Sequence, residues 1–526
     1  HDAVIIRIMP YLENALDRMP VFAELGISRD VHGAISHPPD GNPMVGPAPG
    51  VKNYWCCCGT QIGIGWGPGL TRQLAAWMVH GSADISMREF DPRRFGEYAH
   101  KEWQIIKAKE DYCLRHEIPF PHFNRLEGRP IKPSPLYETL KAKGAVHEEV
   151  FGHERPRWFA RNGVAQQDHY SFRRNDVHDM VAIECQAVRE AAGIMDISAF
   201  TKVEVAGPDA EAFVDRLTAN RLPKKVGGIA LTHMLNRRGR IELETTVVRL
   251  AEDRFYLVCA AFFENRLLDH LNQNKTDEDA DVILRSNDWA AITLNGPKSR
   301  DILAACTDAP LDNANFRWLT AQEISVAGHQ LWALRMSYSG ELGWEFHGSR
   351  DAIKAAYDAF AEVGEPMGML DYGSFAMNAM RMEKAFKGAG ELTNEVTLPE
   401  ADVMRFVKLD KEYLGKDKTV ESVEAAETPW VCAYLEIQPD GVEDGHGGEA
   451  VRMDGEVVGA TSSVAYGHTV GKILAFAYVK PKAATPGQAL EVVIAGEPRA
   501  ASVLGEAAYD PQSELPRTDA VMEAAE

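Results

Sequence analysis

The chain has 526 residues, enough for several domains, and its 45% hydrophobic and 25% charged residues are typical of a globular protein. Its formal net charge of −21 argues against a nucleic-acid-binding surface, and no stretch approaches the roughly 20 apolar residues of a membrane span. The eight cysteines form no C-x-x-C pair, so we predict neither a zinc site nor a disulfide framework, and a reducing compartment is favoured.

The first hundred residues combine a helical pattern from Ile5 to Leu16, a loop over 36–43 and a short apolar strand from Tyr54 to Cys58. A Gly-rich loop over 59–69 then leads into an amphipathic helix over 70–79, closed by Gly81. Backbone N–H groups at such a helix start can face an anionic or electron-rich ligand. The glycine spacing does not fit G-x-G-x-x-G. Because the chain begins with His, we expect it to be part of a longer protein.

The next stretch, to about residue 180, reads as a connector. Residues 101–113 have a helical pattern, whereas the prolines in 116–123 exclude a continuous helix. His116 and His122 lie in that loop, but no third ligand of suitable spacing accompanies them, and we predict no metal site.

Helical and strand patterns alternate in mixed order between about 180 and 420, which favours an α+β domain. We expect helices over 183–192, 208–220, 262–271 and 298–306, and strands over 201–207, 254–259, 290–297 and 341–347. Residues 234–250 predict a β-hairpin whose turn is Asn236–Gly239, with Gly239 free to take a positive φ.

Glu244 is a candidate functional residue in the second strand of that hairpin. Alternation places it with Glu242 and Thr246 on one face, opposite the face that carries Leu243 and Val247. A solvated strand face is the simpler explanation of this pattern. Tyr338 and Glu345 are the other candidates, because a carboxylate can accept paired N–H groups of a heterocycle and a tyrosine offers both a ring face and a hydroxyl.

From about residue 430 the pattern changes to short strands separated by Gly turns, at 431–437, 456–461, 472–479 and 490–494. This pattern predicts a small β-barrel. His468 falls in a predicted loop, and the polar, acidic segment after Pro511 is expected to fray.

Several motifs in this order resemble the dimethylglycine and sarcosine dehydrogenase family. The N-terminal ones are "PDGNPMVGPAP", "LAAWMVHG", "FDPRRFG" and, in the connector, "EGRPIKPSPLYETLKAKGAV". The resemblance implies an FAD enzyme whose flavin-facing segment is Gly63, Ile64, Gly65, Trp66 and Gly67. The family's Rossmann half, which binds the ADP part of FAD, is not in this sequence, so the chain would hold only part of the FAD site.

"LNGPKSRDIL", "SYSGELGWEFH" and "AMNAMRMEKAF" resemble the tetrahydrofolate-binding aminomethyltransferase domain shared with the glycine-cleavage T-protein, and "GEVVGATSSVAYGHTVGKILAFAYV" resembles the barrel that follows it. By this resemblance Glu345 would hold the pterin, Tyr338 would line its pocket and Glu244 would be the catalytic carboxylate. The implied folate-binding set is Glu244, Thr245, Thr246, Tyr338, Glu345, Phe346 and His347.

Two positions depart from the T-protein pattern. Many family members carry Asp where this chain has Glu244, and "RIELETTV" looks closer to the dimethylglycine branch. The T-protein's folate-contacting Arg corresponds to Met377, which weakens a T-protein assignment.

The expected fold is a multidomain α+β protein: a partial FAD-oxidoreductase domain (1–97), a connector domain (98–155), a T-protein-like folate domain (156–425), a C-terminal β-barrel (426–516) and a tail (517–526). The resemblance implies an FAD-dependent N-demethylating dehydrogenase that passes a one-carbon unit to tetrahydrofolate as 5,10-methylenetetrahydrofolate. The electron acceptor, an electron-transfer flavoprotein or oxygen, stays open. We expect a cytoplasmic protein, or a mitochondrial matrix protein in a eukaryote.

Two other functions remain open at this point. One is a stand-alone aminomethyltransferase, against which the flavin-like N-terminal motifs speak. The other is a non-catalytic folate-binding subunit, which the missing Rossmann half keeps possible.

Overall fold

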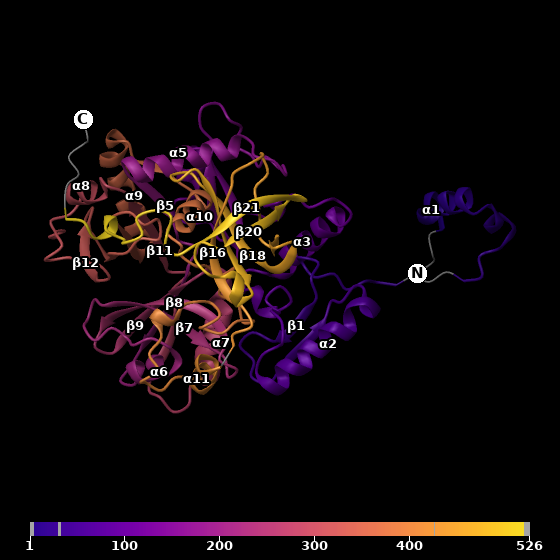
Figure 1. Cartoon of the computed structure of the whole chain (residues 1–526), viewed down its shortest axis with the longest axis horizontal. Helices are drawn as coiled ribbons and strands as arrows, with labels where there is room; N and C mark the ends of the chain where they lie inside the picture. The colour runs from indigo at the N-terminus through magenta and orange to yellow at the C-terminus, as the bar shows by residue number, and fades with distance from the viewer. Residues whose placement is uncertain (1–4, 30–32, 426, 520–526) are drawn as a thin grey trace.

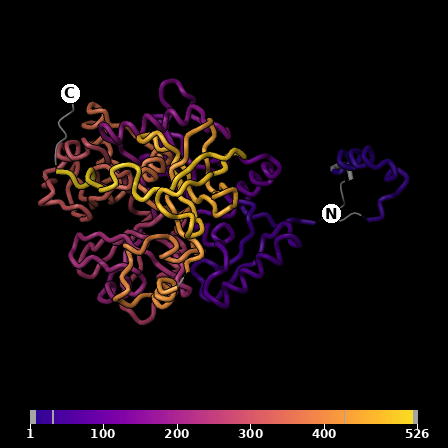
Figure 2. Tube along the Cα trace, in the orientation of Figure 1, coloured from indigo at the N-terminus to yellow at the C-terminus, as the bar shows by residue number. Residues whose placement is uncertain are grey.

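A computed structural model describes residues 5–29, 33–425 and 427–519. The body contains two large β-sheets with their helices, a barrel and an N-terminal unit, grouped around a common centre (Figure 1). Helix α1 (Ile5–Arg18) and the 3₁₀ turn η1 (Pro20–Glu24) lie away from this body, at the end of an extended segment (Figures 1 and 2). Within the described residues, no helix combines the length and the apolar character that a membrane crossing requires.

The N-terminal unit pairs β1 (Met44–Pro47) with β2 (Trp55–Cys58) and packs helix α2 (Gly63–His80) against them. The predicted end of the helix at Gly81 is confirmed, since this glycine takes φ 82°. Its predicted start is wrong, because α2 begins at Gly63, inside the expected loop. Burial of Leu70 and Trp77 stabilises the helix and overrides the weak propensity of its glycines.

The connector includes the 3₁₀ turn η2 and an antiparallel pair of strands that leads into the first helix of the next domain. Its elements are η2 (Pro92–Arg94), α3 (Lys101–Leu114), α4 (Tyr137–Ala142), β3 (Ala145–Val150) and β4 (His153–Phe159).

The first sheet has the order β10-β6-β9-β8-β7 and contains the predicted hairpin. Its strands are β6 (Thr201–Ala206), β7 (Ile229–Leu235), β8 (Ile241–Ala251), β9 (Arg254–Cys259) and β10 (Asp281–Leu284). Gly239 in the turn has φ 72°, and burial alternates as predicted from Ile241 to Val247, after which three consecutive residues are buried. The face with Leu243 and Val247 packs against two helices, α6 (Ala210–Leu217) and α7 (Glu264–Asn274). The 3₁₀ turn η3 (Ala261–Phe263), which connects β9 to α7, belongs to the same apolar cluster.

The second sheet has the order β12-β13-β14-β11-β5-β15 and is antiparallel except for the β5–β15 pair. Its strands are β5 (Gly193–Asp196), β11 (Trp289–Asn295), β12 (Ala321–Val326), β13 (His329–Leu334), β14 (Gly343–Ser349) and β15 (Leu370–Asp371). Helices cover both faces: α8 (Ser299–Ala304), α9 (Arg350–Gly364) and η4 (Glu365–Met367) on one, α5 (Asp176–Glu190) and α10 (Ser374–Glu383) on the other.

The two sheets meet through a cluster of apolar side chains. Val248 and Tyr256 of the first sheet pack there with Ala321 and Leu334 of the second. Because strand residues alternate, Glu244 lies on the same face of β8 as Val248. The sheet packing therefore directs Glu244 toward the middle of the molecule rather than onto an outer face.

A closed barrel of order β16-β19-β18-β17-β20-β21 follows, as the sequence predicts. Its strands are β16 (Val431–Ile437), β17 (Ala450–Met453), β18 (Glu456–Gly467), β19 (Lys472–Val479), β20 (Ala489–Ile494) and β21 (Glu497–Leu504). The segment before the barrel contains η5 (Met404–Phe406) and α11 (Lys416–Glu424), and η6 (Pro481–Ala483) follows β19. The α+β multidomain prediction is confirmed.

The end of the chain crosses from the barrel toward the second sheet (Figure 2). It contains η7 (Leu515–Arg517), and the carbonyl of Arg517 accepts a hydrogen bond of 2.8 Å from Asn313. The fraying expected after Pro511 is therefore wrong for residues up to 519, because backbone groups of this segment form hydrogen bonds with the domain of the second sheet. Residues 520–526 of the predicted tail lie outside the described residues.

Candidate functional site

Glu244 lies in the middle of β8, directly across from His233 of β7. Its Oε1 atom is 3.2 Å from Nε2 of His233, and no Lys or Arg pairs with this carboxylate in the described part of the chain. The Glu244 side chain is 26% exposed, whereas the His233 side chain is fully buried. The carboxylate therefore lies at the boundary between the protein interior and an accessible space.

Tyr338 provides an aromatic surface near this carboxylate. Its hydroxyl donates a 3.0 Å hydrogen bond to the carbonyl of Lys387, and its ring stacks on Phe386 with centroids 5.7 Å apart. Burial raises the pKa of Tyr338; Arg381 opposes this shift and Glu244 adds to it. The residue nevertheless keeps 36% of its surface exposed. A ring that is both surrounded by protein and accessible is suited to stacking against a planar ligand.

Arg381 of α10 is held beside Tyr338. Its Nη1 atom is 3.1 Å from Oε2 of Glu391, whose carboxylate also accepts the N–H of Gly388 at 2.8 Å. A Cβ atom added to Gly388 would lie 3.5 Å from both Tyr338 Oη and Arg381 Nη1. The Tyr338 hydroxyl and the Arg381 guanidinium therefore both lie beside Gly388.

Glu345 of β14 is partly exposed and is linked through hydrogen bonds to two buried polar side chains, His347 and Tyr256. Its Oε2 lies 3.3 Å from Nε2 of His347, and Nδ1 of His347 lies 3.0 Å from the Tyr256 hydroxyl. Because a carboxylate only accepts, Nε2 donates to Glu345, and Nδ1 of the neutral ring accepts from Tyr256. Burial lowers the pKa of His347, and Glu345 counteracts this shift. The Glu345 carboxylate is thus fixed in place by a fully buried support.

The remaining predicted folate residues divide between the two faces of their strands. Thr246 shares the face of Glu244 and is partly exposed. Thr245 is buried and donates a 3.0 Å hydrogen bond to the carbonyl of Val258. Phe346 is fully buried and packs on Phe360 of α9. The Thr245 and Phe346 side chains therefore pack inside the domain and do not reach the space beside Glu244 and Glu345.

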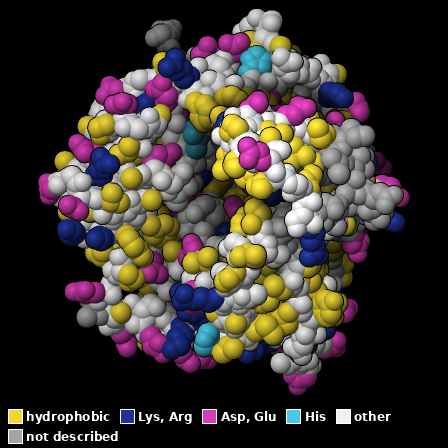
Figure 3. All heavy atoms as spheres, turned by 90° about the vertical axis from the view of Figure 1, so that its right-hand side faces the viewer, with side chains coloured by type: hydrophobic (Ala, Val, Ile, Leu, Met, Phe, Trp, Pro, Cys, Tyr) yellow, Lys and Arg dark blue, Asp and Glu magenta, His cyan; other side chains and the backbone are white. Residues whose placement is uncertain are grey.

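The predicted flavin-facing residues form the first turn of α2 rather than a loop. Ile62, which precedes the helix, makes no side-chain capping bond, so no cap within the described part of the chain occupies the first N–H groups of the helix. Figure 3 shows the side of the molecule on which the N-terminal unit lies, and hydrophobic side chains gather there. The exposed apolar residues that α2 and its N-cap contribute are Ile62, Ile64, Trp66, Met78 and Val79.

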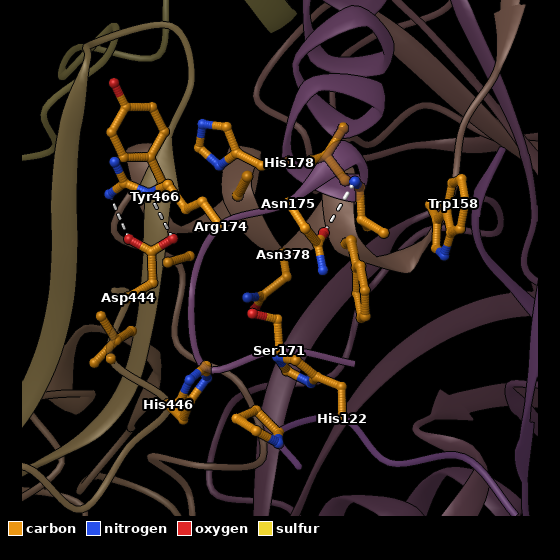
Figure 4. Close-up of a pocket in the computed structure, with 18 of the residues that line it drawn as sticks. His122, Trp158, Ser171, Arg174, Asn175, His178, Asn378, Asp444, His446 and Tyr466 are labelled. Atoms are coloured by element: carbon orange, nitrogen blue, oxygen red, sulfur yellow. Dashed lines mark hydrogen bonds and ion pairs between the residues drawn. The ribbon is translucent and has the colours of Figure 1, made fainter. Parts of the chain in front are cut away.

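A cavity of about 300 Å³, which the sequence did not predict, lies between the connector, α5, α10 and the barrel (Figure 4). Arg174 and Asp444 form an ion pair with distances of 2.5 and 2.8 Å in its wall. Asn378 lies between them and the loop that carries His122. Arg381 also lines this cavity, so the cavity adjoins the surroundings of Tyr338.

Two histidine pairs bridge the barrel and the rest of the protein around this cavity. His122 and His446 have ring centroids 5.5 Å apart, and those of His178 and His468 are 4.7 Å apart. Burial, reinforced by the partner histidine, lowers the pKa of His122 and of His468 to about 4. Both rings are therefore neutral at neutral pH.

These depressed pKa values predict that acid destabilises the protein. The unfolded chain binds protons to these rings below their ordinary pKa of 6.5, while the folded protein binds them only near 4. The stability that these two neutral rings contribute should therefore be fully present above pH 6.5, and it should be lost as the pH falls from 6.5 toward 4. Thermal midpoints measured across this range should fall less in His468→Gln than in the wild type. An identical fall in both proteins would contradict the prediction, and the exposed His329→Gln serves as control.

Sequence reasoning missed His233, Arg381 and the cavity. Counting back from the turn would have paired His233 with Leu243, because a register shift between Met234 and Leu235, which the sequence does not reveal, sets the observed pairing of His233 with Glu244. The other two depend on contacts between distant segments. Within residues 5–29, 33–425 and 427–519, no cluster of three or more His, Cys, Asp or Glu side chains is arranged to hold a metal ion.

Three protein families match this chain in consecutive order. Residues 80–134 match the FAD dependent oxidoreductase central domain, residues 136–411 the GCVT N-terminal domain, and residues 432–510 the glycine cleavage T-protein C-terminal barrel domain. A solved structure of the glycine cleavage system aminomethyltransferase T from Bartonella henselae covers 74% of this chain and 98% of its own, with a TM-score of 0.61. At 22% identity, this likeness shows a shared fold.

Curated relatives match along nearly the whole chain. The mitochondrial dimethylglycine dehydrogenase of Mus musculus is 34% identical over 95% of this chain, and the mitochondrial sarcosine dehydrogenase of Homo sapiens is 30% identical over 90%. The 4-methylaminobutanoate oxidase (formaldehyde-forming) of Paenarthrobacter nicotinovorans is 30% identical over 94%. The chain covers 58%, 56% and 60% of these relatives, little more than half their length. Because the GCVT N-terminal domain match spans more than half of the chain, this protein belongs to the GCVT family, and it resembles the dimethylglycine and sarcosine dehydrogenases.

Proposed function

We propose that this chain is the folate-side part of a flavin-dependent oxidoreductase that demethylates an N-methylated amine such as dimethylglycine or sarcosine. The one-carbon unit then passes to tetrahydrofolate. The order of the three family matches and the names of the relatives support this proposal. So does the meeting of Glu244 and Tyr338, which are separated in sequence and come together beside an accessible space.

The residues present fit part of a flavin site. The first turn of α2 offers free N–H groups at the positive end of a helix, and its glycines leave room for close approach. A Cβ atom added to Gly67 would meet no other atom within 4 Å. Bound flavin would supply the oxidation by taking a hydride from an N-methyl carbon. This chain's contribution there is to hold one edge of the ring with backbone N–H groups.

The residues also fit a pterin. Glu345 offers a fixed carboxylate that can accept two N–H groups of a heterocycle, and Tyr338 offers a ring face. Their supports are rigid, because His347 orients Glu345 and the Lys387 carbonyl and Phe386 ring hold Tyr338. Rigid supports reduce the conformational entropy that ligand binding costs.

The transfer step is balanced without a further reagent. The oxidised amine is an iminium, R₂N⁺=CH₂. Its methylene carbon forms two bonds to the two folate nitrogens, N5 and N10, and its bond to the amine nitrogen breaks. The two protons that leave the folate nitrogens are taken up by the amine, which departs as R₂NH₂⁺. The Glu244 carboxylate would stabilise the cationic carbon and carry a proton between the folate and the leaving amine.

The state of Glu244 is the single observation on which the proposal mainly rests. Several buried carboxylates of the domain pair with arginines; Glu341, for example, lies 2.8 Å from Arg189. Glu244 instead has only the imidazole of His233 within ion-pair distance among the described residues, although it faces the middle of the protein. A carboxylate that faces the protein interior without a cationic partner destabilises the folded protein, and binding of a cationic ligand would relieve this destabilisation.

Tetrahydrofolate titration tests the proposal directly. By isothermal calorimetry, the wild-type chain should bind tetrahydrofolate, and Tyr338→Ala should bind it about fivefold more weakly, because loss of ring stacking costs about 1 kcal/mol. Tyr54→Ala, which removes an exposed tyrosine of the N-terminal unit, is the matched control and should bind normally. Absence of binding by the wild type, or equal affinity of Tyr338→Ala, would contradict the proposal.

A further inference from the structure

His233 is an unusual residue for a protein interior. Its side chain is fully buried, and neither ring nitrogen has a hydrogen-bond partner among the described residues. The ring also lies beside the aromatic ring of Phe406, with centroids 6.1 Å apart. A buried polar group without a partner destabilises the folded state. Packing alone would be served better by an apolar ring, so His233 calls for a functional explanation.

Glu244 is the group toward which His233 is directed. The Nε2 to Oε1 distance of 3.2 Å is within reach of an N–H···O bond, yet the two groups are not aligned for one. A small rotation of either side chain would form the bond. The pair can therefore exist in an open and a bonded arrangement without movement of the strands.

The second sheet contains a matching pair that differs in one respect. His347 is also fully buried and lies 3.3 Å behind Glu345, whose side chain is 16% exposed. That pair is hydrogen-bonded, and the Tyr256 hydroxyl fixes the second ring nitrogen. Each of the two predicted folate carboxylates thus has a buried histidine beside it, and among the described residues only His347 is hydrogen-bonded at both ring nitrogens while His233 is bonded at neither.

We propose that His233 is a positioning residue for Glu244: its Nε2–H bonds to the carboxylate when tetrahydrofolate is bound and orients it for one-carbon transfer. Glu345, which is already locked, would bind the pterin, and Glu244 would be aligned only as the reaction proceeds. This inference rests on the proposed function. It predicts that the loss of the His233 N–H slows transfer and leaves folate affinity unchanged, because Glu345 and Tyr338 provide the binding.

Two substitutions at His233 separate this role from packing. His233→Phe keeps an aromatic ring and removes both nitrogens, and His233→Gln keeps an N–H group near the position of Nε2. We expect the thermal midpoint of His233→Phe to equal or exceed that of the wild type, since an unpartnered buried polar group is removed. Its rate should fall by about tenfold or more, because the reacting carboxylate loses its orientation. His233→Gln should recover most of the rate.

The rates are measured with the full chain, tetrahydrofolate and formaldehyde as the one-carbon donor, by stopped-flow detection of 5,10-methylenetetrahydrofolate above the uncatalysed reaction. Affinities come from calorimetry with tetrahydrofolate alone, and His329→Gln is the exposed-histidine control. A His233→Phe rate equal to that of an active wild type would overturn this inference alone. Failure of His233→Gln to recover the rate would do the same. A wild-type chain without any acceleration would overturn the proposed function and this inference together.

Discussion

Replacing Glu244 with Gln should nearly abolish one-carbon capture by the chain, with a fall in rate of about 100- to 1000-fold. The amide is similar in shape to the carboxylate, so the strand and its pairing with β7 should be preserved. It carries no negative charge, however, and can neither stabilise the cationic methylene carbon nor take up a proton. Formation of 5,10-methylenetetrahydrofolate from formaldehyde and tetrahydrofolate, followed in stopped flow, measures this loss.

Glu323→Gln is the matched control for this substitution, because Glu323 also lies on a strand of this domain but faces solvent. It should retain the full rate. The affinity of Glu244→Gln for tetrahydrofolate should remain within a few fold of the wild type, since Glu345 and Tyr338 are unchanged. If Glu244→Gln captured formaldehyde as fast as the control variant, Glu244 would have no catalytic role, and its partial exposure would be that of an ordinary strand residue.

Replacing Arg189 with Met should lower the free energy of unfolding by about 3–5 kcal/mol, the largest stability effect that we predict. The guanidinium of Arg189 lies 2.8 Å from Glu341 and 2.7 Å from Glu383, and it stacks over Tyr509 at 4.1 Å. All three charged side chains are at most 7% exposed. Methionine fills the space but leaves two buried carboxylates without their cation.

Denaturant titration of Arg189→Met measures this loss, with Lys354→Ala as the control. Lys354 and Asp358 form an ion pair on α9 whose side chains are 37% and 54% exposed. Removing such a surface pair changes stability by less than about 1 kcal/mol. If Arg189→Met lost no more stability than Lys354→Ala, the buried network would not hold α5, α10 and the end of the chain together as its contacts indicate.

The effect of Arg189 should extend to the candidate site. Glu341 follows Tyr338 within one loop, and Glu383 ends the helix that carries Arg381. Arg189 therefore ties together the two segments whose side chains meet beside Gly388. Loss of folate affinity in Arg189→Met would follow from movement of this loop, whereas the surface control should leave affinity unchanged.

The sequence by itself determined the features that depend on local pattern. Alternation in β8 placed Glu244 on a face distinct from that of Leu243, and the Asn236–Gly239 turn defined the hairpin, because strand geometry and a positive φ impose these patterns on neighbouring residues. The change to short strands after residue 430 likewise indicated the barrel. The motifs also indicated an aminomethyltransferase-type domain, and the GCVT N-terminal domain match over residues 136–411 then showed that family.

Tertiary structure alone decided how these elements act together. Packing of Leu70 and Trp77 made a helix of the glycine-rich segment at Gly63, against its local propensity. The contact between the two sheets brought Glu244 near Tyr338, and the hairpin register put an unpartnered His233 behind it. Packing against Phe360 of α9 buried Phe346, although its neighbour Glu345 is partly exposed. These outcomes depend on which residues from distant segments share a buried space, and local patterns do not contain that information.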